Sequence, residues 1–380
     1  MDTQTSELNL FRDNVVRFLA DEVEPHYEAW EKAGIFPAEL YLKMGEAGLL
    51  CVDMPEEYGG IGAPFEFSMV VLYEVARMGF LALASNLSVH SDIAAPYILH
   101  LGSEEQKKYW LPKMASGEKI GAIGMTEPGA GSDLQGIKTS ALADADGNFI
   151  VNGSKTFITN GQNANLIVVV AKTDPSLGAR GTSLIMLETE DAEGFERGRN
   201  LDKMGRDSSD TSELFFNDVR VPTANLLGAS AGEGFVQLMQ KLPQERLILA
   251  VQAMAAIEYA LALTIDYVKQ RRAFGKAILD FQNTQFKLAE CKTEATVARV
   301  FVDHCVERHL KGELDSPTAS MAKYWVTDLH CKIVDECLQL FGGYGYMNEY
   351  PIAQAYKDAR INRIYGGTNE IMKILIARTL

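Results

Sequence analysis

A loop of small and hydroxyl-bearing residues offers the first chemistry in this sequence. The segment Met125-Thr126-Glu127-Pro128-Gly129-Ala130-Gly131-Ser132-Asp133 combines two glycines and a proline with the hydroxyl groups of Thr126 and Ser132. Glycine and proline favour irregular backbone, in which several N–H groups can face one polar ligand. The same composition also suits an ordinary turn that leads into β structure. Taken alone, the loop does not decide between a ligand site and a turn.

Several common ligand motifs are absent or incomplete. No GxGxxG occurs, so a Rossmann dinucleotide site lacks its usual signature. Residues 131–139 resemble a P-loop, but an isoleucine separates the last glycine from the lysine. His304, Cys305 and His309 share one helical stretch without a supporting carboxylate at metal-ligand spacing. Five cysteines form no CxxC pair, which predicts no disulfide framework and fits a reducing compartment.

Composition and charge limit the classes of ligand and location. The 380 residues include 36 Lys+Arg and 51 Asp+Glu, a formal net charge of −15 that argues against generic nucleic-acid binding. An anionic ligand would therefore need a local basic patch. The chain has no apolar run of about 18 residues and no signal or transit peptide pattern at its start. We expect no membrane span, and a location in a bacterial cytoplasm or, as a mature form, in the mitochondrial matrix.

Three zones of the chain differ in hydrophobic period, and each predicts a domain. Residues 1–118 repeat apolar positions at three- and four-residue intervals. This pattern predicts helices near 37–47, 64–78, 86–100 and 103–116. Ser103 and Gln106 are expected to form a capping box at the last of these helices.

The middle and C-terminal zones follow other patterns. Residues 119–226 carry short β-branched runs at 149–153, 155–159, 166–170, 183–187 and 213–216, with no helix-length segments between them. They predict a middle antiparallel β-barrel or sandwich rather than a βαβ sheet. Residues 227–380 predict a helical bundle, with helices at 234–272, 281–310, 317–340 and 370–380 and an expected kink at Pro243. The expected fold class is α+β, in the order α, β, α.

Four further segments complete a pattern that begins with the 125–133 loop. They are residues 155–161 (Lys-Thr-Phe-Ile-Thr-Asn-Gly), 203–222, 271–276 (Arg-Arg-Ala-Phe-Gly-Lys) with Gln282, and 339–346 followed by 364–370. In this order and spacing, the chain resembles the acyl-CoA dehydrogenase family over essentially its whole length. The resemblance implies a helical domain, a β domain and a C-terminal four-helix domain. It also implies bound FAD and a homotetramer built as a dimer of dimers.

The resemblance assigns two groups of residues to FAD. The first group is expected to contact the flavin ring and comprises Met125, Thr126, Gly131, Ser132, Phe157, Ile158 and Thr159. Within it, Thr126 and Thr159 would form hydrogen bonds to the edge of the ring, and Phe157, where relatives often have tryptophan, would cover the ring. The second group is expected to reach the FAD of a neighbouring subunit and comprises Arg271, Gln282, Gln339, Leu340, Phe341, Gly342 and Gly343. A guanidinium such as that of Arg271 can bind a pyrophosphate in bidentate fashion.

The start of the last helix forms a further cofactor candidate. Thr368, Asn369 and Glu370 match the family's pattern there. The free N–H groups and the positive end of the helix dipole would favour a nearby phosphate.

The reaction that the resemblance implies needs a carboxylate base. In α,β-desaturation of an acyl-CoA, a base removes the α proton while the β hydrogen leaves as hydride to the flavin. Many family members carry this base in a Tyr-Glu-Gly-Thr stretch, which here reads Tyr365-Gly366-Gly367-Thr368. The long-chain and isovaleryl-CoA dehydrogenases also have glycine there and place the base on the kinked helix of the C-terminal domain. The segment 242–247 (Leu-Pro-Gln-Glu-Arg-Leu) matches that alternative, so Glu245 is the expected base.

The remaining family positions concern the substrate. The N–H of Gly366 would bind the thioester oxygen together with a ribityl hydroxyl of FAD, a kind of donor that often supplies the largest catalytic contribution. Arg246 and the pair Ala179-Arg180 match positions that contact CoA. The other expected substrate contacts are Ser132, Pro243, Gln244, Glu245 and Gly367. Position 206 departs from the pattern, because it is arginine where many relatives have tryptophan near the approach of the electron acceptor.

The resulting hypothesis is an FAD-dependent acyl-CoA dehydrogenase for medium or long acyl-CoA, branched chains included. Electrons would pass to electron-transfer flavoprotein. The sequence of residues 242–247 and 90–107 is most similar to the long-chain subgroup. The alternatives are an isovaleryl-type enzyme for short branched chains and a catalytically idle flavoprotein that acts in complex assembly. An oxygen-using oxidase fits less well, because the acyl-CoA oxidases of this superfamily are generally much longer.

Overall fold

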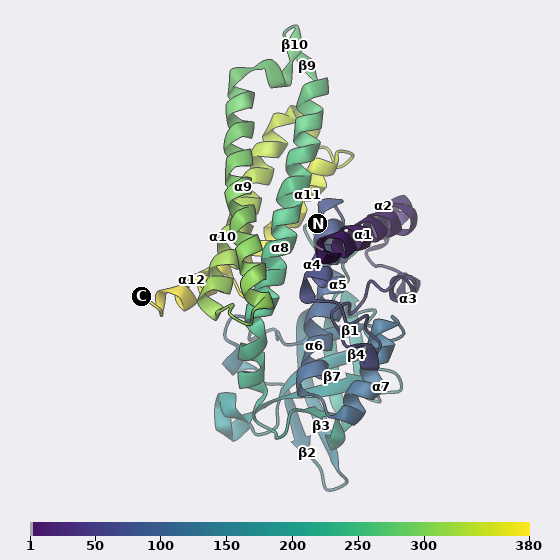
Figure 1. Ribbon diagram of the computed structural model, residues 1–380. Helices are drawn as coiled ribbons and strands as arrows, with labels where there is room; N and C mark the ends of the chain where they lie inside the picture. Colours follow the sequence, from purple (N-terminus) through teal and green to yellow (C-terminus); the bar gives the residue numbers. More distant parts are fainter. Residues whose placement is uncertain (1–2) are drawn as a thin grey trace. The chain divides into compact units, whose positions relative to one another are not determined.

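The computed structural model describes residues 3–380, with side chains from residue 6 onward (Figure 1). The chain divides into two compact units. The first contains the chain up to Ser68 together with Ser85–Lys203 and Asp207–Leu242. The second contains Met69–Ala84, Met204–Arg206 and Pro243–Leu380. Helical and β zones of the N-terminal half share one unit, and the three-domain division at residues 118 and 226 stays a prediction.

The N-terminal helices are α1 (Thr3–Phe18), α2 (Glu24–Ala33), α3 (Ala38–Glu46), α4 (Phe65–Arg77), α5 (Leu81–Leu87), α6 (Ala95–Leu101) and α7 (Glu104–Ala115). The capping box of Ser103 and Gln106 at α7 is confirmed. The helix expected at 86–100 is instead α5, a π-helical stretch over Ser88–Ala94, and α6. Pro96, in the first turn of α6, lacks the N–H that a regular α-helical ladder requires. Helix α2 buries none of its residues, so no apolar stripe marks it in the sequence.

One eight-stranded sheet forms the β part of the first unit. Its strands are β1 (Gly121–Gly124), β2 (Ser140–Ala143), β3 (Asn148–Thr159), β4 (Leu166–Lys172), β5 (Thr182–Glu188), β6 (Phe195–Asn200), β7 (Thr211–Pro222) and β8 (Leu226–Leu227). They follow the order β6-β7-β3-β2-β4-β5-β8, with β1 beside β4. The β domain is confirmed, and most pairs are antiparallel. However, β1 and β2 pair parallel with β4, which the expected antiparallel arrangement did not include.

Strand β4 is buried along its whole length because both of its faces are covered. Val168 and Val170 pack into a cluster that includes Ile98 and Leu111 of the helices, whereas Ile167 belongs to a core within the β domain. Strands β1, β2 and β5 therefore pair with a central strand that is packed on both faces. The two strands expected at 149–153 and 155–159 are one strand, β3, with irregular register against β7.

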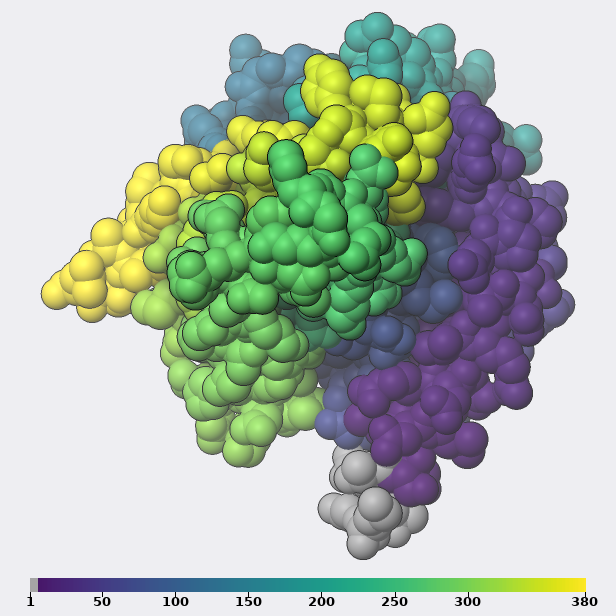
Figure 2. Space-filling view, turned by 90° about the horizontal axis from the view of Figure 1, so that it is seen from above, coloured from purple at the N-terminus to yellow at the C-terminus, as the bar shows by residue number. Residues whose placement is uncertain are grey.

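The second unit is a helical bundle built from α8 (Gly234–Gln270, here from Pro243 onward), α9 (Gln282–Leu310), α10 (Ser316–Leu340), α11 (Pro351–Ala359) and α12 (Asn369–Ala377). Helix α10 contacts α9, α11 and α12. A hairpin of β9 (Arg272–Ala273) and β10 (Lys276–Ala277) joins α8 to α9 at one end of the bundle (Figure 1). The C-terminal end, drawn in yellow, projects beyond the other helices of this unit (Figure 2). Helix α11 was not expected from the sequence.

Helix α8 is long and apolar enough to cross a membrane by length and composition. Of its most apolar 18-residue window, 72% is buried within the protein, as in the core helix of a soluble protein. Pro243 lies inside the helix, at the point where the two compact units meet along the chain.

Candidate active site

The 125–133 loop of the first unit is a tight, open-sided turn. Glu127 and Ala130 exchange backbone hydrogen bonds of 3.0 and 3.1 Å, which close the turn. A Cβ built on Gly129 or Gly131 would meet no atom within 4 Å, so the outer side of the loop is open. Ser132 is exposed beside it. This geometry leaves room for a ligand against the backbone of the loop.

The loop is joined directly to the segment that the family pattern assigns to the flavin. The N–H of Thr156 donates to the carbonyl of Thr126 over 2.9 Å. Phe157 follows in a left-handed conformation (φ 59°) and is 67% exposed, as a ring that covers a bound partner should be. Ile158, in contrast, is buried in the β core, so only its backbone can contact a cofactor. Thr159 is half-buried at the end of β3.

A buried ion pair fixes the inner side of this loop. The Nζ atom of Lys155, which is fully buried, lies 2.8 Å from Oε1 of Glu127 and donates to the carbonyl of Met125 over 3.2 Å. Glu127 also accepts hydrogen bonds from the N–H groups of Lys138 and Thr139. Burial lowers the pKa of Lys155 to about 8, against the opposing effect of Glu127, so the ammonium is mostly retained at pH 7. The loop therefore has a fixed charged support, which the sequence analysis missed.

A second buried lysine supports the loop that carries Ala179 and Arg180. Lys172 donates to the carbonyl of Gly178 over 2.6 Å and to the hydroxyl of Thr182 over 3.0 Å. Arg180 itself is exposed, and Ala179 is half-buried. The exposed guanidinium is available for an anionic ligand, as expected of a CoA contact.

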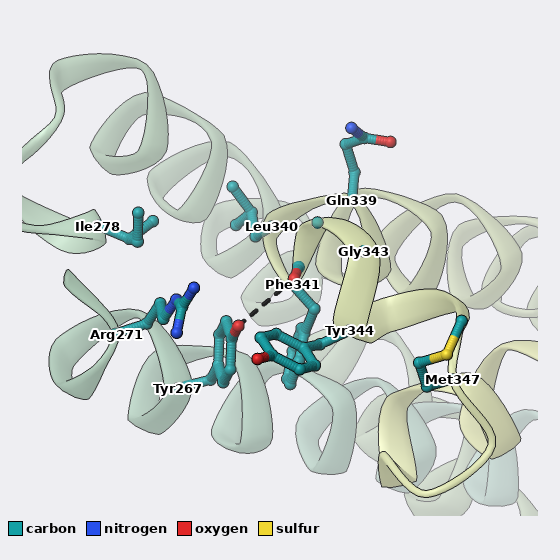
Figure 3. Close-up of a pocket in the computed structure, with 10 residues that line it drawn as sticks. Tyr267, Arg271, Ile278, Gln339, Leu340, Phe341, Gly343, Tyr344 and Met347 are labelled. Atoms are coloured by element: carbon teal, nitrogen blue, oxygen red, sulfur yellow. Dashed lines mark hydrogen bonds between the residues drawn. The ribbon is translucent and has the colours of Figure 1, made fainter. Parts of the chain in front are cut away.

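In the second unit, a cavity of about 610 Å³ collects most of the residues assigned to the neighbouring subunit's FAD (Figure 3). Its lining includes Arg271 and the whole 339–343 loop. The Arg271 guanidinium lies 5.3 Å from the ring centre of Tyr344, and the Tyr267 hydroxyl donates to the Phe341 carbonyl over 3.4 Å. Positions Gly342 and Gly343 have open space on their Cβ sides. A cation above open backbone fits a phosphate-bearing group.

Two other expected cofactor residues differ from this group. Gln282 is exposed at the start of α9 and does not line the cavity. Thr368 caps α12 by accepting from the N–H of Ile371, with exposed Glu370 in the first turn. Asn369 is buried, and its side-chain amide donates hydrogen bonds to Thr327 and Asp328. Its side chain therefore has a structural role within the protein.

The expected base and the 365–368 turn both belong to the second unit. Gly366 has φ +62°, and a Cβ built on it would come within 2.4 Å of Cδ1 of Leu249. Glu245 precedes Leu249 by one helical turn on α8, and residues four apart share a helix face. Glu245 is 8% exposed. The α8 face that carries Glu245 is thus the face that packs against the Gly366 turn.

Neighbouring positions on α8 are arranged differently from one another. Pro243 and Gln244 are half-buried. Arg246 is only 4% exposed, and its Nη1 donates to the hydroxyls of Ser316 and Ser320 on α10. Its guanidinium is therefore oriented partly by α10, and its contact with CoA stays a prediction.

Arg206 is buried rather than presented to a partner. It is 4% exposed and bonded to Asp358, Asn362 and Tyr365. Lys323, which the sequence analysis did not single out, is fully buried and bonded to the Gly367 carbonyl. A charged residue in an apolar helical stretch was the one available signal for Lys323.

Among the described residues, no group of three or more His, Cys, Asp or Glu could hold a metal ion, and the five cysteines are free.

Comparisons with known proteins agree with this fold. Models of the acyl-CoA dehydrogenase N-terminal, middle and C-terminal domains match residues 5–118, 122–219 and 232–380. A long-chain specific acyl-CoA dehydrogenase, mitochondrial, of Sus scrofa is 50% identical, over 99% of this chain and 87% of its own. Isovaleryl-CoA dehydrogenase, mitochondrial, of Arabidopsis thaliana is 34% identical, over 97% and 90%. The crystal structure of an acyl-CoA dehydrogenase from Geobacillus kaustophilus has a TM-score of 0.95 at 50% identity and covers 98% and 97%.

The fold and its family matches define a flavin-dependent oxidoreductase. The chain belongs to the acyl-CoA dehydrogenase family, and its cofactor is FAD. The residues present fit that group. The open 125–132 loop with exposed Phe157 suits a flat ring, and the cavity around Arg271 suits phosphates.

Proposed function

We propose that this protein oxidises medium- to long-chain acyl-CoA thioesters, branched ones included, to trans-2-enoyl-CoA, with Glu245 as the base. The observation that carries the proposal is the placement of Glu245. The carboxylate sits on the α8 face that packs against the Gly366 turn, where the family's usual carboxylate is replaced by glycine. The 50% identity to the long-chain relative supports the chain-length class.

The proposed roles follow from the positions of these residues. Glu245 takes the α proton as a general base, from a position that is 8% exposed. The N–H of Gly366 donates to the thioester oxygen, where negative charge develops. Among residues 3–380, none accepts a hydrogen bond from that N–H. Bound FAD supplies the acceptor for the β hydrogen and its electron pair.

The Lys155–Glu127 pair and Lys172 hold the two loops of the first unit that carry the remaining contacts. Through the first loop, Thr126 and Phe157 orient the ring of the cofactor. Through the second, Arg180 offers positive charge to the phosphates of CoA, against the overall charge of −15.

The alternative is an isovaleryl-type enzyme, which shares the glycine and the relocated base and has a relative at 34% identity. A catalytically idle assembly factor is disfavoured by the retained, buried Glu245. We further propose electron-transfer flavoprotein as the acceptor and a homotetramer as the functional form. The exposed Phe274, Val297 and Val300 of the second unit, at 95%, 54% and 66%, offer apolar surface for subunit contacts. For location, a bacterial cytoplasm or a mitochondrial matrix both agree with the family's members.

The test is anaerobic flavin bleaching by a panel of acyl-CoA thioesters, from isovaleryl and butyryl to palmitoyl. We expect fastest bleaching at medium or long chains in the wild type. In Glu245→Gln, bleaching should slow by at least about 100-fold, the low end for loss of a positioned general base. FAD content should stay at the wild-type level. Normal bleaching in Glu245→Gln would refute the base, and fastest bleaching by isovaleryl-CoA would select the alternative.

A further inference from the structure

Lys323 anchors one flank of the turn that carries Gly366. Its Nζ donates to the carbonyl of Gly367 over 2.7 Å and to Oδ1 of Asn369 over 2.9 Å. Asn369 is itself fixed by Thr327 and Asp328 of α10. The side chain of Lys323 is fully buried, so water cannot replace these bonds. The carbonyl of Gly367, one residue after Gly366, is thus tied to the centre of α10.

Arg206 anchors the other flank. Its Nη1 donates to the hydroxyl of Tyr365 over 3.0 Å, and its guanidinium carbon lies 5.2 Å from the centre of the Tyr365 ring. The remaining donors bind the Asp358 carbonyl over 3.2 Å and the Asn362 side chain. Its own N–H donates to the Asp358 carboxylate over 2.6 Å. The arginine therefore joins Tyr365 to the end of α11 and the residues that follow it.

A turn of three residues with two left-handed glycines needs such anchors. Gly366 and Gly367 have φ values of +62° and +89°. Glycine adopts positive and negative φ values about equally readily, so neither residue fixes this conformation by itself. The three residues themselves provide little that would hold one geometry. A donor that stabilises charge must be fixed before the charge develops, because its orientation then costs nothing during the reaction.

We propose that Lys323 and Arg206 are positioning residues that clamp the Tyr365–Gly367 turn from its two flanks and so aim the Gly366 N–H at the thioester oxygen. The inference rests on the proposed role of Gly366. It extends that role to two buried cations more than forty residues from the turn in sequence, at separations of 44 and 159 residues. Arg206 then acts inside the protein and not as a docking residue for the electron acceptor.

The clamp predicts a specific kinetic defect. Loss of one oxyanion donor lowers kcat by about 10²- to 10³-fold, and a displacement of about 1 Å can cost about 10²-fold. Lys323→Met keeps an unbranched side chain of nearly the same length and removes the charge and its donors. We expect it to lower kcat by about 10- to 100-fold with KM changed less than about 3-fold, because binding of the CoA part does not depend on the turn. Arg206→Met should do the same to a smaller degree, since the turn keeps its Lys323 anchor.

The second readout is spectroscopic and does not depend on turnover. A bound enoyl-CoA product absorbs at longer wavelength when a hydrogen bond polarises its thioester carbonyl. In the Glu245→Gln background, this shift should be present with Arg206 and Lys323 intact and reduced by Lys323→Met. Lys323→Arg, which retains a cation and donors, should recover part of the shift.

Matched controls separate positioning from general loss of a buried cation. Arg299→Met removes a half-buried arginine of the same unit that also lies on a tyrosine ring, Tyr73, and pairs with Glu258. Lys119→Met removes a lysine that is 5% exposed and paired with Glu188 and Glu190. Both should lower thermal stability without changing kcat or the spectral shift.

The outcomes are distinct. A wild-type spectral shift and kcat in Lys323→Met would overturn the clamp, while a slow Glu245→Gln enzyme would leave the proposed function in place. If the controls reduce kcat as much as Lys323→Met does, the clamp is likewise refuted. If Glu245→Gln bleaches at the normal rate, the proposed function fails, and this result is independent of the clamp variants.

Discussion

Leu249 occupies the space that a side chain at Gly366 would need, with its Cδ1 atom 2.4 Å from the ideal Cβ position. A side chain at position 366 therefore requires Leu249 to move. The left-handed φ of +62° adds strain of about 1–3 kcal/mol for any residue other than glycine. Glycine at 366 and leucine at 249 are therefore linked, and the proposed base, Glu245, lies one turn before Leu249 on α8.

This relationship predicts how the base can be moved. Glu245→Gly combined with Gly366→Glu should stay as slow as Glu245→Gly alone, because the new side chain meets Leu249. Adding Leu249→Ala should raise the rate of flavin bleaching by at least about 10-fold, a fraction of the 10²- to 10⁴-fold worth of a placed base. Leu249→Ala alone is the reference for its own effect, and its stability will fall by about 2–5 kcal/mol.

The contradicting result is equally clear. If the double variant already bleaches at the rate of the triple variant, Leu249 gives way at little cost, and the steric link is wrong. FAD content measured in each variant separates loss of the base from loss of the cofactor.

The second prediction concerns retention of FAD. Arg271→Ala removes the one guanidinium that lines the cavity around the 339–343 loop among the described residues. A hydrogen bond to a charged group is worth about 1.5–3 kcal/mol, so the dissociation constant of FAD should rise by about 10- to 100-fold. Flavin absorbance per chain after gel filtration measures how much FAD each variant retains. Arg272→Ala is the control, because its Nη2 donates to the Gly275 carbonyl over 3.1 Å and it does not line the cavity. Equal FAD content in the two variants would contradict the assignment of Arg271.

Contacts between residues near in sequence could be predicted here, whereas contacts between residues far apart in sequence could not. The Ser103–Gln106 capping box spans three residues and was predicted correctly from local sequence. The Lys155–Glu127 pair spans 28 residues and joins a strand to a loop, and the Lys323–Gly367 bond spans 44. Hydrophobic period indicates which face of an element is buried, but it carries no information about which buried lysine meets which oxygen. Family resemblance supplied the candidate base, and the approach of Leu249 to Gly366 supplied a physical reason for glycine at position 366.

The third prediction concerns CoA. Arg180→Ala should raise KM for acyl-CoA by about 3- to 10-fold with kcat nearly unchanged, as expected for an exposed charge pair of up to about 1 kcal/mol or slightly more. The effect should vanish with an acyl-pantetheine thioester, which lacks the nucleotide phosphates. Arg199→Ala, which removes another exposed arginine of the same unit, should leave both constants unchanged. Unaltered kinetics in Arg180→Ala would remove this residue from the site.

The last prediction concerns acid stability. His90 is fully buried in the first unit, accepts the Gly121 N–H at Nδ1 over 2.9 Å, and is 3.0 Å from the Met114 carbonyl through Nε2. Burial lowers its pKa to about 4, whereas the unfolded chain has a value near 6.5. The unfolded state therefore binds the proton more tightly than the folded state. The stability that this histidine contributes is present above pH 6.5 and is lost as the pH falls toward 4.

The expected size of this loss follows from the shift. A difference of about 2.5 pKa units corresponds to roughly 3 kcal/mol of the free energy of unfolding. Urea unfolding at pH 7.0, 5.5 and 4.5 should show a midpoint that falls across this window. His90→Gln should be less stable at pH 7 but should lose less between pH 7 and 4.5, because glutamine does not titrate. His304→Gln, at an exposed position, should follow the wild-type pH dependence. An equally steep loss in His90→Gln would assign the acid sensitivity to other groups.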